Sequence, residues 1–266
     1  MHHYEISRER AISFAGFLSG RSRKSLKATT KGGLRRRAEA IPYGAVVLHR
    51  LLKVGGLKSV VISACGVREG VLASALSAEE RRKDPLLVAC AEMAKRLGRD
   101  TALAASLDSW IAPLFAAEPT SSARLRLAAA HLSDTDWRVN HAHRSESAFA
   151  DVMNAPFVGI DHQGRALLAL AAYRRYGGDD DSAVKPVERF AGEALSEQAT
   201  KLGLALRAGL ALAGGLQTEI LATSTLRLTP LSLILRLPKS RMALIGEQPL
   251  EELADAFRRT MRIELR

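Results

Sequence analysis

The chain has 266 residues, of which 47% are hydrophobic, 5% aromatic and 25% charged. This is an ordinary soluble composition, with enough apolar residues for one large core or several small ones. The longest apolar stretch, residues 202–216, contains Arg207 and is too short to span a bilayer. The first ten residues also lack the apolar core of a signal peptide. We therefore expect a cytoplasmic protein without a membrane segment.

The two cysteines, Cys65 and Cys90, both lie in apolar stretches, and no zinc-ligand spacing is present. Buried thiols in a reducing compartment fit this pattern better than a disulfide framework. Alanine and leucine are abundant while aromatic residues are few, which favours helices that pack through small side chains.

The net charge of +11 is unevenly placed along the chain. Residues 1–53 hold 12 Lys or Arg and three acids, a net charge of +9. Such a segment attracts polyanions such as polyphosphate, nucleotides, nucleic acid or anionic lipid. The alternative is a solvated basic surface without a specific ligand.

The N-terminal part predicts an α/β segment at the edge of a larger sheet. Ser7 is placed to cap the first helix and Gly20 to end it, while Gly55 and Gly56 stop a later helix. The β-branched run at residues 58–65 predicts a buried strand. In chain order, we expect a helix at 7–18, a short helix from Ser22, a helix at 45–54, the strand, and a helix after Gly66.

A charged stretch at residues 77–85 marks a boundary, and the chain beyond it is helical. Asp84 is expected to cap a helix that begins at Pro85 and stops at Gly98. Further helical patterns follow, the last of them a long helix at residues 193–213.

In the C-terminal part, the hydrophobic residues change from helical spacing to the alternating spacing of strands. Residues 224–238 alternate like two short strands on either side of Thr229 and Pro230, and residues 242–248 suggest a third strand. Residues 249–265 are expected to form a terminal amphipathic helix.

The stretch GVREG, which includes Gly66, Arg68, Glu69 and Gly70, joins the predicted strand to a helix. A strand that ends in glycine before a helix leaves N–H donors at the positive end of the helix dipole, which suits a phosphate. Arg68 adds a planar guanidinium that matches phosphate oxygens. The alternative is a tight turn with a surface Arg–Glu pair.

A second candidate anion site precedes the turn at Pro42 and Gly44. Arg35, Arg36 and Arg37 form a run there that could clamp an anion. The commoner explanation of such a run is a solvated charged surface.

Histidines and aspartates gather in the middle of the chain. Metal-dependent phosphohydrolases of the HD type need a histidine, a His-Asp doublet and a distant aspartate, because these ligands fix a divalent metal that activates water. Here Ser133 precedes Asp134 where the doublet histidine would stand. We therefore expect no metal site and retain only weak candidate ligands: His131, Asp134, His141 and His143.

Motifs of catalysis are absent from the sequence. It contains no G-x-S-x-G, no Walker-type G-x-x-x-x-G-K-[ST] and no G-x-G-x-x-G, and no pair of carboxylates suggests a general acid and base. We therefore expect no catalytic residue in this chain.

Several segments together resemble one family. Residues 2–22, 34–52 and 59–72 resemble the later part of the second core lobe of the exopolyphosphatase/guanosine pentaphosphate phosphohydrolase (Ppx/GppA) family. Residues 84–99, 124–138 and 159–178 resemble the helical, degenerate HD-like extension of its long members, and residues 225–238 their small C-terminal module.

The resemblance implies an α+β, mainly α chain in three parts. Residues 1–82 would belong to a partial actin/Hsp70-like (ribonuclease H-like) lobe, the C-terminal part of the second phosphatase core lobe. Residues 83–188 would form an all-α HD-like domain. Residues 189–266 would form a helix followed by a small β-hairpin and helix module.

The resemblance also implies a function. Members of the family remove terminal phosphates from inorganic polyphosphate or guanosine pentaphosphate, using Mg²⁺ and a glutamate base, and long members suggest a homodimer. The base and the Mg²⁺ ligands belong to the first lobe and the start of the second, which this sequence does not contain. We therefore expect a C-terminal portion that binds substrate, is inactive alone, and exposes an apolar face through which it self-associates. Substrate phosphates would be held by Arg36, Arg37, Gly66, Arg68, Glu69 and Gly70.

Two other functions stay open at this stage. The chain could be a non-catalytic regulatory module that binds a polyanion or alarmone through its basic N-terminal segment. It could also be an HD-type metal phosphohydrolase that uses the histidine group. Nucleic acid and membranes are not expected partners.

Overall fold

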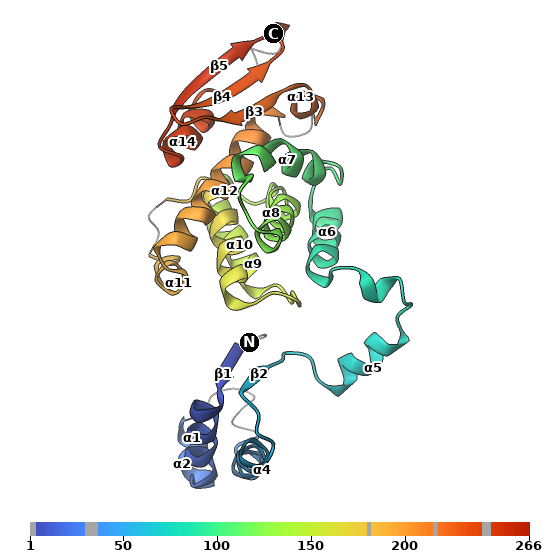
Figure 1. Ribbon diagram of the computed structural model, residues 1–266, viewed down its shortest axis with the longest axis vertical. Helices are drawn as coiled ribbons and strands as arrows, with labels where there is room; N and C mark the ends of the chain where they lie inside the picture. The colour runs from blue at the N-terminus through green and yellow to red at the C-terminus, as the bar shows by residue number, and fades with distance from the viewer. Residues whose placement is uncertain (1–3, 30–36, 180–181, 215–217, 241–245) are drawn as a thin grey trace. The chain divides into compact units, whose positions relative to one another are not determined.

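The computed structural model describes residues 4–29, 37–179, 182–214, 218–240 and 246–266 (Figure 1). The chain divides into two compact units, Met1–Leu72 and Ala73–Arg266. The described residues are mostly helical and include two small sheets. The predicted mainly α, α+β class is thereby confirmed.

The first unit contains a two-stranded sheet and helices on it. Ser7 caps the first helix as predicted, because its Oγ accepts a hydrogen bond from the Arg10 N–H (3.4 Å). The strands pair antiparallel, with Tyr4 opposite Ile62 and Ser7 opposite Ser59. The elements are β1 (Tyr4–Ser7), α1 (Arg8–Ser19), α2 (Arg23–Thr29), α4 (Ile41–Val54), β2 (Ser59–Ile62) and α5 (Val67–Ala75), which extends past the end of the unit.

The core of the first unit is small. Helix α1 packs on α4 through Ala11, Ala15 and Leu52, and the Arg8 Nε donates to the Leu52 carbonyl at 3.2 Å. The strand predicted at 58–65 is present as β2, but it covers only four residues and is not buried, since Val61 is 54% exposed. The two strands are antiparallel, and an antiparallel sheet can leave one face to solvent, so its β-branched residues can stay accessible.

The second unit is a helical body that carries a three-stranded sheet (Figure 1). Its helices are α6 (Pro85–Leu97), α7 (Leu103–Ile111), α8 (Thr120–Leu132), α9 (Arg144–Asn154), α10 (His162–Arg175), α11 (Lys185–Ala191), α12 (Glu193–Leu212), α13 (Thr218–Thr223) and α14 (Gln248–Ala256). Short 3-10 turns are η1 (Glu80–Arg82), η2 (Ala112–Phe115) and η3 (His141–His143), and the strands are β3 (Thr225–Leu228), β4 (Ser232–Leu237) and β5 (Thr260–Leu265).

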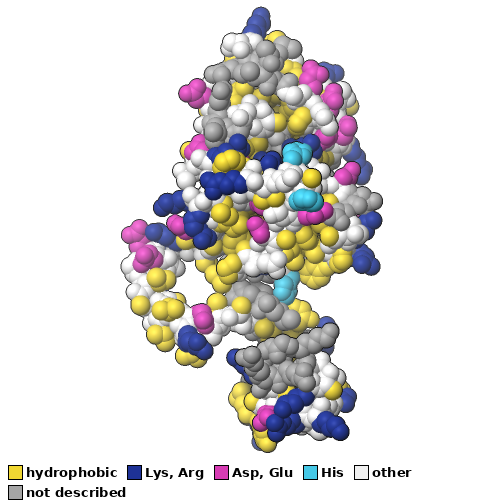
Figure 2. All heavy atoms as spheres, turned by 180° about the vertical axis from the view of Figure 1, so that it is seen from behind, with side chains coloured by type: hydrophobic (Ala, Val, Ile, Leu, Met, Phe, Trp, Pro, Cys, Tyr) yellow, Lys and Arg dark blue, Asp and Glu magenta, His cyan; other side chains and the backbone are white. Residues whose placement is uncertain are grey.

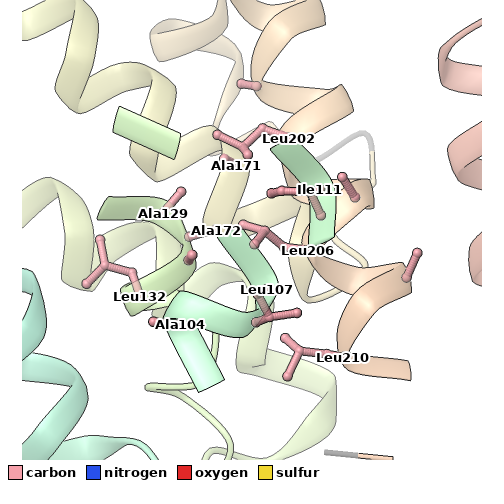
Figure 3. Close-up of a cluster of buried hydrophobic side chains, with 14 of the residues drawn as sticks. Ala104, Leu107, Ile111, Ala129, Leu132, Ala171, Ala172, Leu202, Leu206 and Leu210 are labelled. Carbon is pink, nitrogen blue, oxygen red and sulfur yellow. The ribbon is translucent and has the colours of Figure 1, made fainter. Parts of the chain in front are cut away.

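The helices of this unit pack closely because small residues face one another, as the composition predicted. Alanines and leucines of α7, α8, α10 and α12 point into one cluster (Figure 3). A Cβ on Gly203 would lie 2.5 Å from the Ala171 carbonyl oxygen, so only glycine lets α12 approach α10 this closely. A Cβ on Gly209 would lie 2.7 Å from the Leu107 Cδ2, so the small residue here also brings α12 close to α7, although this contact is with a side chain that can shift.

The sheet has the order β3-β4-β5, with β3 antiparallel and β5 parallel to β4. The two strands around Thr229 and Pro230 are confirmed. The prediction of one helix over 249–265 is wrong, because α14 ends at Ala256 and β5 follows. Arg258, at φ 55°, interrupts the helical path, and the alternation of TMRIEL after it is that of a strand.

Other predictions for this unit are only partly tested. Of the strand expected at 242–248, residues 242–245 lie outside the described residues, and Gln248 begins α14. The three-part division at 82/83 and 188/189 stays a prediction, as does the actin-like lobe; one buried cluster runs from Leu86 to Ala254. Among the described residues no helix combines the length and apolar character needed to cross a membrane.

Candidate phosphate-binding site

The predicted phosphate-binding junction lies between β2 and α5. A backbone N–H of this junction is already occupied by Glu69, whose Oε2 accepts a hydrogen bond from the Gly66 N–H at 2.6 Å. This hydrogen bond, and a second one to its own N–H, hold the pKa of Glu69 below its ordinary value. A carboxylate therefore caps the N-terminus of α5, the position expected for a bound phosphate.

The remaining groups of the junction face solvent. Arg68 is exposed in the first turn of α5, and the Gly70 N–H donates to the Gly66 carbonyl (3.1 Å) as part of the helix. A phosphate that used the Gly66 N–H would have to displace the Glu69 carboxylate. Phosphate binding by these residues stays a prediction.

The second predicted anion site is described only in part. Arg35 and Arg36 lie outside the described residues, while Arg37 begins the turn before α4 and has an exposed side chain. The Arg37 carbonyl accepts from the N–H groups of Ala40 (2.9 Å) and Ile41 (3.2 Å), which fixes the turn. Arg37 thus lies in the turn that precedes the N-terminus of α4, and a helix N-terminus favours an anion.

The structure does not pack these two candidate segments together. Helix α5 has no buried residue, and it makes no more than marginal contact with any other described element. Arg37 and Arg68 are thus two separate cationic positions of this chain.

The first unit presents exposed hydrophobic as well as basic side chains. On the face seen in Figure 2, Lys and Arg gather on this unit beside apolar groups. Helix α4 exposes 77% of Tyr43, 58% of Leu51 and 69% of Val54. A mostly apolar groove of about 860 Å³ lies along β1 and α1, lined in part by Tyr4 and Phe14.

In the second unit, arginines bind the segment of Ser133 and Asp134, the sequence position where an HD-type site would have its His-Asp doublet. Asp134 lies 2.5 Å from the Arg99 Nη2 and also accepts from the Arg99 backbone N–H. The Arg175 Nε donates to the Ser133 carbonyl at 2.8 Å, and the Arg144 Nη2 to the Trp137 carbonyl at 2.9 Å. These arginines hold the loop between α8 and η3 in place through hydrogen bonds. Asp134 is the ion-pair partner of Arg99. The sequence carries no periodic signal of this cluster, since the arginines come from three separate segments.

The histidines do not converge either. His131 is half-buried in α8, and burial lowers its pKa; His141 lies in η3, and the His143 Nδ1 is 4.0 Å from a carboxylate oxygen of Glu146. Within the described ranges, no three His, Cys, Asp or Glu side chains are grouped so as to hold a metal ion. The weak candidate ligands therefore do not fit a metal centre within the part of the chain that the structure describes.

Comparison with known families identifies the second unit. The family described as "Exopolyphosphatase, C-terminal" matches residues 86–262, which is more than half of the chain. The chain belongs to this family, as its resemblance indicated. No curated protein matches the sequence. The family links the chain to polyphosphate-related phosphohydrolases.

Proposed function

We propose that this chain is the C-terminal portion of an exopolyphosphatase-type phosphohydrolase, which binds inorganic polyphosphate or guanosine pentaphosphate and associates as a homodimer in the cytoplasm. The family match at residues 86–262 is the observation that carries the proposal. The basic N-terminal segment, at +9 over residues 1–53, supports a polyanionic ligand.

The proposed role of the first unit is to hold phosphates. Arg37 and Arg68 are exposed, Arg68 in the first turn of α5 and Arg37 in the turn before α4, and the dipole at a helix N-terminus also favours anions. Such groups lower the energy of phosphoryl transfer by positioning substrate and neutralising charge. The base that activates water would be a residue outside this chain. Residues outside this chain would also hold the Mg²⁺ that the family uses.

A second candidate is a regulatory module that binds polyphosphate or an alarmone without cleaving it. The sequence favours this reading in one respect, because it contains no catalytic motif and no pair of carboxylates that suggests a general acid and base. Both candidates bind the same class of phosphate ligand, but only the phosphohydrolase cleaves it.

Binding and turnover can be measured on the same preparation. Titration of the full chain with medium-length polyphosphate is expected to show binding that Arg68→Ala and Arg37→Ala each weaken about 3- to 10-fold. The matched control is Arg227→Ala, which removes the same charge from an exposed position of β3. Equal weakening in all three variants would reduce the effect to net charge and overturn the assignment of these residues.

Phosphate release with Mg²⁺ present separates the candidates. The chain alone is expected to release none, and to release phosphate when the family's first lobe is added in trans. Release that never appears, with binding intact, would favour the regulatory module. Release by the chain alone that Arg68→Ala abolishes would show a complete active site within it.

A further inference from the structure

In the part of the chain that the structure describes, β5 is an edge strand of the C-terminal sheet. Within the described residues it pairs with β4 alone. The Thr260 N–H donates to the Leu231 carbonyl (3.1 Å), and the Arg266 N–H to the Leu237 carbonyl (3.0 Å). Since the backbone groups of a strand alternate in direction, this phase turns the N–H and C=O of Met261, Ile263 and Leu265 outward.

This edge lacks the usual protection against pairing. Edge strands of soluble proteins are commonly short, bulged, interrupted by proline or lined with charged side chains, and like charges on two copies repel each other. Strand β5 runs for six residues, TMRIEL, without proline or glycine and in unbroken register with β4. Its two charged residues, Arg262 and Glu264, have opposite signs and both are exposed.

We propose that β5 pairs antiparallel with β5 of a second copy of this chain, about a two-fold axis at Ile263. The outward backbone groups of Ile263 then bond to those of Ile263 in the second copy, and Met261 pairs in the same way with Leu265. The two three-stranded sheets join into one sheet of six strands. The occupant of this edge is thus a second copy of the same segment.

Charge selects this register over its neighbours. With the axis at Ile263, Arg262 of each copy faces Glu264 of the other, in a pair of close Cα spacing. An axis one residue earlier would oppose two copies of Arg262, and an axis one residue later two copies of Glu264. Only the Ile263 register makes both charged pairs attractive.

The neighbouring strand extends this complementarity. Glu264 already lies 2.5 Å from the Arg236 Nε on β4. In the paired sheet, Glu264 would stand between Arg236 of its own chain and Arg262 of the second copy. These three side chains would therefore form a row of alternating positive and negative charge across the interface between the two copies.

The apolar face of β5 also gains from pairing. Met261, Ile263 and Leu265 stand opposite the buried leucines Leu233, Leu235 and Leu237 of β4, so they share the core face of the sheet. Leu265 is nonetheless 39% exposed. In the paired sheet it lies beside Met261 of the second copy, which removes apolar surface from water.

The inference rests on the proposed association of two copies, and not on polyphosphate binding. Exposed apolar residues of the first unit offer a separate route to association, so dimerisation alone does not test it. The test therefore uses charge reversals that repel within one variant and attract between two.

Sedimentation velocity of the full chain is compared for Arg262→Glu, for Glu264→Arg and for an equimolar mixture. Each variant alone places two like-charged pairs across the join, and its dimer dissociation constant is expected to rise about 10- to 50-fold. In the mixture every pair is of opposite charge, so dimers are expected to return. The matched control, Arg227→Glu on β3, is expected to dimerise like the wild type.

Recovery in the mixture supports the pairing even if one variant is less stable, because only the join couples the two substitutions. Variants that dimerise like the wild type would overturn β5 as the interface while leaving the proposed dimer intact. A mixture that stays monomeric would overturn it as well. A monomeric wild type would overturn both this inference and the proposed dimer, whereas failed polyphosphate binding would overturn the proposed function alone.

Discussion

Asp84 joins the start of α6 to α8 through Arg124. Its Oδ1 accepts from the N–H groups of Leu86 (2.9 Å) and Leu87 (3.2 Å), and the Arg124 Nη2 donates to the same oxygen at 2.8 Å. Arg124 also donates to the Gly159 carbonyl at 2.7 Å. One carboxylate thus serves as a helix cap and as an ion-pair partner.

Replacing Asp84 is therefore expected to destabilise the second unit in two steps. Asp84→Asn keeps a capping oxygen and loses the charge, at a cost of about 1–2 kcal/mol, while Asp84→Ala loses both, at about 2–3 kcal/mol. Chemical denaturation checks the order. The control is Glu92→Gln, at an exposed position of α6, and it is expected to be neutral. Equal losses in both Asp84 variants would show that the cap contributes nothing.

The Asp84 pair also gives a pH dependence. The hydrogen bond from Arg124 is the main reason why the pKa of Asp84 lies below its ordinary value. A carboxyl with a lowered pKa stabilises the fold above its unfolded value of about 3.9, and that contribution is lost as the pH falls through the folded pKa. The gap between wild type and Asp84→Asn is expected to stay constant from about pH 5 to 8 and to close in acid. A gap that persists at low pH would contradict the ion pair.

Arg126 is a buried arginine whose guanidinium pairs with two carboxylates. It donates from Nη1 to Asp108 at 2.5 Å and from Nε to Glu118 at 2.6 Å, and it is 9% exposed. Burial raises the pKa of Asp108 despite this partner. Removal of the guanidinium would leave both carboxylates partly buried and unpaired.

Arg126→Met is accordingly expected to cost about 3–5 kcal/mol, because breaking a buried pair strands its partners. Thermal unfolding of the full chain measures the loss. Arg96→Met, at an exposed position of α6, is the control and is expected to change little. A neutral result at Arg126 would mean that water already solvates the two carboxylates.

Local signals explain which elements could be predicted. The caps at Ser7 and Asp84, and the alternation on either side of Pro230, depend on neighbouring residues, and the structure confirms all three. The strand TMRIEL was missed because it follows an amphipathic helix after only a few residues. The turn between them at Arg258 has no glycine or proline to mark it.

The candidate site was less accessible to prediction. The sequence indicated a phosphate-binding helix start at Gly66, but the spacing of Gly66 and Glu69 is also that of a side chain that caps its own helix. Contacts between distant segments, such as Arg175 with Ser133, leave no local pattern. Those contacts therefore emerge only in the folded chain.

The two cysteines are expected to differ strongly in reactivity. Burial raises the pKa of Cys90 to about 12, whereas Cys65 is only partly buried. Because the thiolate is the reactive form, a disulfide reagent at pH 8 should modify one thiol of the native protein at least about 100-fold faster than the other. Cys65→Ser is expected to remove the fast phase, and unfolding should expose Cys90. A fast phase that survives in Cys65→Ser would show that α6 opens readily.

Glu69 offers the sharpest test of the helix start as an anion site. Its carboxylate occupies the Gly66 N–H, and its lowered pKa keeps it charged at neutral pH. Glu69→Ala frees that donor and removes a negative charge beside Arg68, so polyphosphate is expected to bind about 3- to 10-fold more tightly. Glu79→Ala, the matched control, removes the same charge from an exposed position ten residues later. If both variants tighten binding equally at fixed ionic strength, the gain comes from net charge and the α5 N-terminus is a capped turn. If only Glu69→Ala does, the junction binds phosphate, and Glu69 is the group that the ligand must displace.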